Sequence, residues 1–216
     1  MNSVLDIGLS ITQSIRFISK VGAECDHLAK LIREEVSRML LAPEIADRYR
    51  AGGQWIEAFA NDEQGWLCAQ MGSSLPVVIK PKRSVCGYIV VQISLSEDGI
   101  NADDNHQPLV HVGWWASAID FEQFVMTFPI ELDSEFDLSL EADRLFRWNH
   151  SRYEEEWCYS LYLTDINSPA DVQALIVKPL KVLLSGGGAD RALSDTRAVR
   201  YAAVEGKPGQ YRVLPR

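Results

Sequence analysis

The first forty residues carry apolar side chains at a regular spacing. From Val4 to Met39 the apolar positions advance by three or four residues, with ten steps over 35 residues. This period is typical of an amphipathic α-helix. Gly22 is predicted to divide the pattern into helices over 3–20 and 23–41, and Pro43 to end the second helix. The apolar stripe consists of Val4, Ile7, Ile11, Ile15, Ile18, Val21, Cys25, Leu28, Ile32, Val36 and Met39.

We expect this stripe to be buried against the protein's own sheet, because the flanking positions show no regular opposite charges that would specify a partner helix. A coiled-coil seam between copies of the chain is the alternative. The residues expected to be buried are Ile11, Ile15, Leu28 and Ile32.

The middle of the chain is a succession of short apolar runs separated by polar turns. The runs are rich in β-branched and aromatic residues, and a turn over 61–65 that ends in Gly65 separates the first two. Such a succession predicts a largely antiparallel meander. The predicted strands span 54–60, 65–71, 75–80, 85–95, 108–116, 121–132 and 156–166.

Helical signals return in the last third of the chain. Residues 139–148 are predicted to form a helix. Ser168, Pro169 and Asp171 are typical of a helix start, because a serine cap, a proline at the first position and an early acid all suit the free N–H groups there. The helix continues to about residue 184, and Pro179 is expected to kink it because proline removes one backbone hydrogen bond.

Together these elements predict an α+β fold. N-terminal amphipathic helices and a Pro-kinked C-terminal helix pack on a mainly antiparallel β-sheet. A chain of 216 residues fits one domain over 1–216. Within it we expect a helical segment over 1–50, the sheet and its helix over 51–188, and a basic tail over 189–216 that could form a hairpin around 207–209.

Charge is distributed unevenly along the chain. Residues 84–143 contain twelve acids and no Lys or Arg, a formal charge of −12, whereas the whole chain carries −9. An acidic protein lacks the basic surface that general nucleic-acid binding or attachment to anionic lipid requires. No apolar run approaches a membrane span and no signal peptide is evident, so we expect a cytoplasmic protein.

The acidic stretch ends in an alternating run over 130–141. In an extended chain, alternate residues point to opposite faces, so the carboxylates would form a ladder on one face. We expect this ladder to bind a basic protein partner, and a solvated edge strand protected from aggregation is the alternative. The predicted contact residues are Glu131, Asp133, Glu135 and Asp137.

No motif for a metal or a cofactor is recognisable. The four cysteines form no CxxC pair, and we expect them to be reduced and mostly buried. The acidic loop at 98–105 fails as a calcium loop, because His106 and Val112 stand where an EF-hand needs glycine and glutamate. We therefore expect no cofactor and no bound metal.

The sequence also contains no motif for a catalytic nucleophile. There is no GxSxG elbow, and His111 and His150 are the histidines that we keep as candidates for a functional pocket. We therefore predict a non-enzymatic interaction module that acts through its acidic surface, such as an immunity or antitoxin-like inhibitor or an accessory subunit. Two alternatives remain: a hydrolase or nuclease with dispersed catalytic residues, and a structural oligomer assembled through the N-terminal helices.

Overall fold

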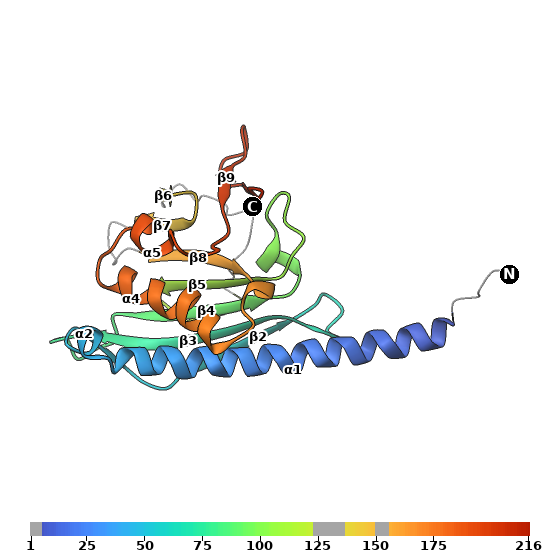
Figure 1. The fold of residues 1–216 in the computed structure, drawn as a ribbon, viewed down its shortest axis with the longest axis horizontal. Coiled ribbons are helices and arrows are strands. Elements are labelled where there is room, and N and C mark those ends of the chain that lie inside the picture. The colour runs from blue at the N-terminus through green and yellow to red at the C-terminus, as the bar shows by residue number, and fades with distance from the viewer. Residues whose placement is uncertain (1–5, 123–136, 150–155) are drawn as a thin grey trace.

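An antiparallel sheet of eight strands forms one layer of the protein, and helices cover one of its faces (Figure 1). The computed structural model describes residues 6–122, 137–149 and 156–216. This architecture confirms the predicted α+β fold. The helices are α1 (Ile7–Leu40), α2 (Pro43–Ala46), η1 (Glu97–Ile100), η2 (Leu163–Asp165), α3 (Pro169–Val172), η3 (Gln173–Val177), α4 (Lys178–Leu184) and α5 (Ala189–Leu193). The strands are β1 (Tyr49–Ala51), β2 (Ile56–Asn61), β3 (Cys68–Ile79), β4 (Gly87–Ser94), β5 (Leu109–Trp115), β6 (Asp137–Glu141), β7 (Leu145–Asn149), β8 (Glu156–Tyr162), β9 (Tyr201–Ala203) and β10 (Tyr211–Val213).

The strands of the large sheet lie in the order β1-β3-β4-β5-β8-β7-β6, and β2 also pairs with β3. The segments predicted as separate strands over 65–71 and 75–80 belong to one continuous strand, β3, with Pro76 inside it. Pro76 is tolerated there because β2 pairs only as far as Ser74 and β1 begins its pairing at Val77. The missing N–H therefore falls between two partner strands.

Helix α1 is one continuous helix, so the predicted break at Gly22 is wrong. Ile32 is completely buried and Leu28 is half-buried against the core, but Ile11 and Ile15 are 60% and 55% exposed. The prediction of burial is therefore wrong for the first half of the stripe. These residues are exposed because α1 is longer than the body on which it packs, so that its first part extends beyond that body (Figure 1).

The predicted helix over 139–148 is also wrong, because this segment forms a hairpin of β6 and β7. Ala142 and Asp143 have φ angles of 49° and 57°, the left-handed pair that suits a tight hairpin turn. Leu140 pairs with Phe146 across the two strands and packs with it on the same apolar cluster. Cross-strand packing outweighs the helix propensity of this segment.

The C-terminal helix begins as its sequence predicts and accommodates Pro179 by a local change of hydrogen bonding. The Ser168 side chain accepts a hydrogen bond from the Asp171 N–H. Before the proline, η3 is a π-helical turn, and the Tyr159 hydroxyl donates to the Leu175 carbonyl at 3.0 Å. Leu175 is the residue whose carbonyl Pro179 leaves without its helical donor. A side chain from β8 thus satisfies the carbonyl at the expected kink.

The two faces of the sheet have different coverings. Helix α1 and the C-terminal helix pack on one face and share the largest apolar cluster with alternate residues of β3, β4, β5 and β8. The small β9–β10 hairpin, which confirms the turn predicted around 207–209, belongs to a cluster on the opposite face. Tyr201 and Tyr211 of this hairpin pack around Phe146 of β7.

Candidate functional sites

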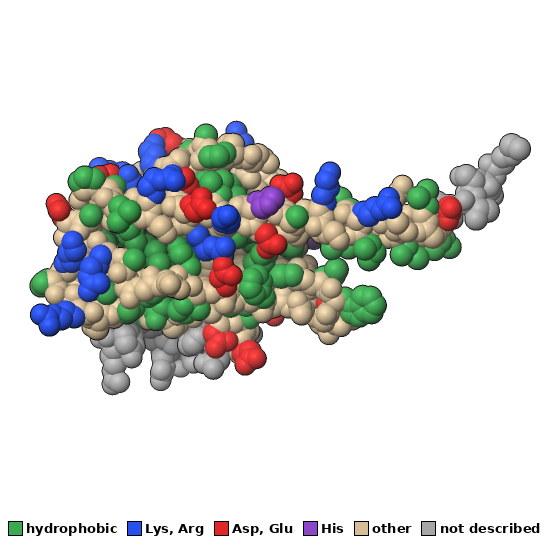
Figure 2. Space-filling view, turned by 90° about the horizontal axis from the view of Figure 1, so that it is seen from below, with side chains coloured by type: hydrophobic (Ala, Val, Ile, Leu, Met, Phe, Trp, Pro, Cys, Tyr) green, Lys and Arg blue, Asp and Glu red, His purple; other side chains and the backbone are tan. Residues whose placement is uncertain are grey.

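The first turns of α1, residues 7–23, form an arm with an apolar surface in contact with solvent. Figure 2 shows hydrophobic side chains gathered along one side of this arm, in the part that projects beyond the body of the protein. Large apolar side chains in solvent are a liability unless they meet a partner, so the arm is the strongest interaction candidate. The exposed fractions are 71% for Ile7, 54% for Leu9, 60% for Ile11, 55% for Ile15, 68% for Phe17 and 37% for Ile18.

The arm carries little charge. Residues 7–23 contain no Asp or Glu, and Arg16 and Lys20 are their only basic residues. Asp6 supports the start of the helix by accepting a hydrogen bond from the Leu9 N–H. A helical segment of this length is marginal in water when nothing packs against it. An arm of this kind is stabilised when its apolar side is covered.

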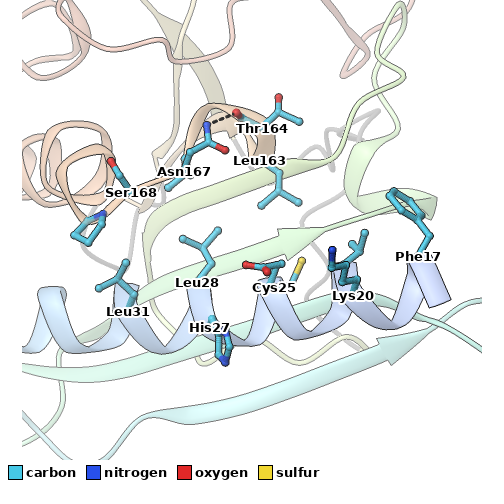
Figure 3. Close-up of a pocket in the computed structure, with 14 residues that line it drawn as sticks. Phe17, Lys20, Cys25, His27, Leu28, Leu31, Leu163, Thr164, Asn167 and Ser168 are labelled. Carbon is cyan, nitrogen blue, oxygen red and sulfur yellow. Dashed lines mark hydrogen bonds between the residues drawn. The ribbon is translucent and has the colours of Figure 1, made fainter. Parts of the chain in front are cut away.

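An apolar groove begins where the arm joins the body. Its volume is about 610 Å³, and it lies between α1 and the segment from η2 to the start of α3. Figure 3 shows Leu28 and Leu31 pointing into it from α1 and Leu163 from the opposite wall, whereas His27 points away. Lys20 and Asn167 supply polar groups to its lining. The groove offers shape and apolar surface, and the titratable residues of its lining, Lys20, Glu24, Cys25 and His27, all come from α1.

His111 lies in a buried polar cluster on the other face of the sheet. It is completely buried. Its Nε2 lies 2.6 Å from the Gly99 carbonyl oxygen and its Nδ1 lies 2.8 Å from the Ser160 hydroxyl. A carbonyl only accepts, so Nε2 carries the proton and Nδ1 accepts from Ser160. Burial lowers the pKa of His111 to about 4, so the ring is neutral near pH 7.

Neither His111 nor the buried cysteines have the features of catalytic groups. The His111 ring has no exposed surface through which a substrate could reach it. Burial raises the pKa of Cys25 to about 11 and that of Cys158 to about 12, which disfavours the reactive thiolate. Contrary to the expectation that most cysteines are buried, Cys68 is exposed and Cys86 is half-buried. In the described part of the chain, no group of three His, Cys, Asp or Glu side chains could hold a metal ion.

The predicted acidic ladder falls largely outside the residues that the structure describes. Glu131, Asp133 and Glu135 lie outside them, as does His150, and Asp137 starts β6 although its side chain is not described. The prediction that this ladder binds a basic partner therefore stays a prediction.

Two acids at the end of the 84–143 stretch contact cations. Glu141 pairs with Arg147 at 2.8 Å and Asp143 pairs with Arg200 at 3.2 Å. Both arginines come from outside that stretch. Folding thus pairs part of the negative charge of residues 84–143 with basic residues from other parts of the chain.

A second cavity was not foreseen from the sequence. About 340 Å³ in volume, it is lined by four arginines that come from three separate segments. The only sequence signal was the net positive charge of residues 189–216, which contain six basic residues and three acids. Charge alone did not predict that Arg144 of the β6–β7 turn would join them. The four residues are Arg144, Arg197, Arg200 and Arg216.

Comparison with known proteins identifies no relative. No family model, no curated protein and no solved structure matches the chain. Among the described residues, no helix has both the length and the apolar content needed to cross a membrane.

Proposed function

We propose that this protein is a non-enzymatic interaction module that assembles with a second copy of itself through the arm of α1. The observation that carries the proposal is the stripe of four exposed isoleucines on one side of the arm, Ile7, Ile11, Ile15 and Ile18. Surfaces of this kind mark interaction sites in soluble proteins. A second copy brings an equal apolar stripe, whereas His111 is completely buried and out of reach of a substrate.

The spacing of the stripe supports an antiparallel pair of arms. Each residue turns the helix by about 100°, so Ile7, Ile11, Ile15 and Ile18 fall within an arc of roughly 80°. With the two-fold axis near residue 13, Ile11 of one copy lies opposite Ile15 of the other. The same side of the helix is then used by both copies, as a two-fold interface requires.

The charged residues of the arm do not oppose this arrangement. Arg16 and Lys20 are each two residues from Ile18, which places them about 160° around the helix from it. They stay in solvent when the stripes meet, and like charges are not brought together. An antiparallel pair also keeps the two bodies at opposite ends of the paired arms.

The expected affinity is modest. An overlap of residues 7–18 is about 18 Å long. Complete burial of an isoleucine is worth roughly 1.5–3 kcal/mol, and these side chains are already partly covered. The gain over both arms is then on the order of 10 kcal/mol, against an association cost of about 4–15 kcal/mol. At the lower end of this cost the net gain is about 6 kcal/mol, which corresponds to a dimer that forms at tens of micromolar.

Sedimentation velocity over a concentration series tests the proposal. The wild-type chain should shift from monomer to dimer across the micromolar range. Ile11→Glu should weaken the dimer at least tenfold, because the interface would bury two carboxylates beside apolar side chains. Gln13→Glu is the matched control, because Gln13 is exposed and lies about 160° from both Ile11 and Ile15.

Two results would contradict the proposal. One is a monomer at every concentration. The other is equal weakening by Ile11→Glu and Gln13→Glu, which would show a general charge effect. If the monomer instead floats with anionic lipid vesicles and Ile11→Glu abolishes this binding, the arm is a membrane element and the dimer is wrong.

A further inference from the structure

We propose that the arginine-lined cavity binds a phosphate monoester. This arginine pocket is formed by the β6–β7 turn, the segment between α5 and β9, and the residues after β10. Its lining includes Tyr162 and Val199, which belong to the apolar cluster on the face of the sheet opposite α1. The inference does not depend on self-association through the arm.

The positive charges of the pocket exceed the acids that pair with them. Asp165 pairs with Arg216 at 2.6 Å and lies 3.9 Å from Arg197, so one carboxylate faces two guanidinium groups. Asp143 pairs with Arg200 at 3.2 Å. Four guanidinium groups against two carboxylates leave a formal charge of +2. A dianion would balance it.

Arg144 supplies the sharpest indication of a ligand. Its Nε is buried, and no hydrogen-bond partner for this atom exists among the residues that the structure describes. A buried donor without an acceptor is costly, and more so when it carries charge. Native proteins rarely leave such groups unsatisfied. An acceptor oxygen bound in the pocket would remove this cost.

The pocket is held together by bonds between its three segments. The Tyr201 N–H donates to the Asp143 carbonyl at 2.7 Å, and the Leu214 N–H donates to the Arg200 carbonyl at 2.8 Å. The guanidinium of Arg216 stacks over the Tyr162 ring at 4.2 Å. The segments that carry the arginines are therefore held together before any ligand arrives, which reduces the entropy cost of binding.

The chemistry of the lining favours a phosphate group on a small organic molecule. Guanidinium groups present paired donors that match phosphate oxygens. A volume of about 340 Å³ exceeds the need of a bare phosphate and lies at the lower end for small-molecule sites. Val199, Leu214 and Pro215 add apolar surface on which the carbon part of an ester can rest.

Isothermal titration calorimetry with glycerol 3-phosphate tests the inference, with sodium chloride of equal ionic strength as the reference. Binding should be saturable, and Arg144→Gln should weaken it at least tenfold. Arg197→Gln should also weaken binding, and its arginine is exposed, so the fold should tolerate this change. Arg191→Gln is the matched control: it removes the same charge from an exposed position outside the pocket and should leave affinity unchanged.

Three results would overturn the inference. The first is no binding of glycerol 3-phosphate at millimolar concentrations. The second is an equal loss of affinity in Arg144→Gln and Arg191→Gln, which would show attraction to general surface charge. The third is tighter binding of inorganic phosphate than of the ester, which would show that the apolar wall of the pocket contributes nothing.

Discussion

His111 shows how one residue can couple the fold to pH. Its imidazole accepts from Ser160 and donates to Gly99, so both ring nitrogens are used in the neutral form. The Gly99 carbonyl belongs to η1, and His111 therefore links that turn to β5 and β8. A proton on Nδ1 would remove the acceptor that Ser160 uses and would place a charge in a buried cluster.

This coupling predicts that the protein loses stability on mild acidification. The unfolded chain binds a proton on His111 below about pH 6.5, whereas the folded chain does so only near pH 4. The unfolded state therefore gains protons first, and the free energy of unfolding falls as the pH drops between these values. The expected loss between pH 7 and pH 5 is about 2 kcal/mol. Urea denaturation at the two pH values measures it.

A histidine variant isolates this contribution from that of the carboxylates. His111→Gln keeps a donor for the Gly99 carbonyl without a titrating ring, so its stability should fall less over the same interval. His27→Gln removes an exposed imidazole and should behave as the wild type. If wild type and His111→Gln lose stability equally, the histidine does not carry the effect.

At the scale of an element, helix α1 shows that a regular apolar pattern does not by itself determine which residues are buried. Its apolar stripe has one period from end to end, yet only the second half meets the sheet. Gly22 lies where the arm joins the body, and a Cβ built there would meet no atom within 4 Å. A glycine in a helix interior costs roughly 0.5–1 kcal/mol relative to alanine.

We therefore predict that Gly22→Ala stabilises the protein by about 0.5–1 kcal/mol, measured by urea denaturation. Gly113→Ala is the contrasting variant, because its Cβ would lie 2.4 Å from the Trp157 carbonyl oxygen. It should destabilise the protein by about 1–3 kcal/mol. A loss of stability in Gly22→Ala would mean that the helix does need a break at this residue.

The whole molecule combines a negative net charge with two basic features. Its formal charge is −9, yet the arm carries Arg16 and Lys20 and the arginine pocket has more cations than acids. Clustered carboxylates over 84–143 repel one another, and a basic partner would relieve that repulsion and associate faster. We predict that this partner contacts the acidic ladder, because the carboxylates of the ladder alternate with mostly apolar residues and would share one face of an extended chain.

The rate of association with a lysine-rich peptide, measured at two salt concentrations, tests whether the acidic ladder binds a basic partner. Changing both Asp133 and Glu135 to Lys should slow association at least tenfold. The melting temperature should stay nearly unchanged, because the ladder is predicted to face solvent and charges in solvent add little stability. The matched control changes Glu63 and Glu205 to Lys, an equal change of charge at exposed positions elsewhere. Equal slowing in both variants would remove this ladder from consideration.

Local chemistry determined the features that the sequence predicted well. The period of the apolar residues determined that α1 is a helix, and the Ser168-Pro169 start determined where the C-terminal helix begins. The strand runs and the turn at Gly65 likewise predicted the β2–β3 hairpin. Each of these signals acts between residues a few positions apart, so a single sequence is enough to show it.

Tertiary structure alone decided the rest, because the deciding contacts join distant parts of the chain. Residues 139–148 have helical propensity, but pairing of β7 with β8 makes them a hairpin. The arm has a core-like stripe, but the sheet ends before it, and no local signal gives the extent of a sheet. The arginine pocket unites Arg144 with residues more than fifty positions later. Spacing along the chain showed the stripe of the arm, but only packing decided that its first half is exposed and that the four arginines share one pocket.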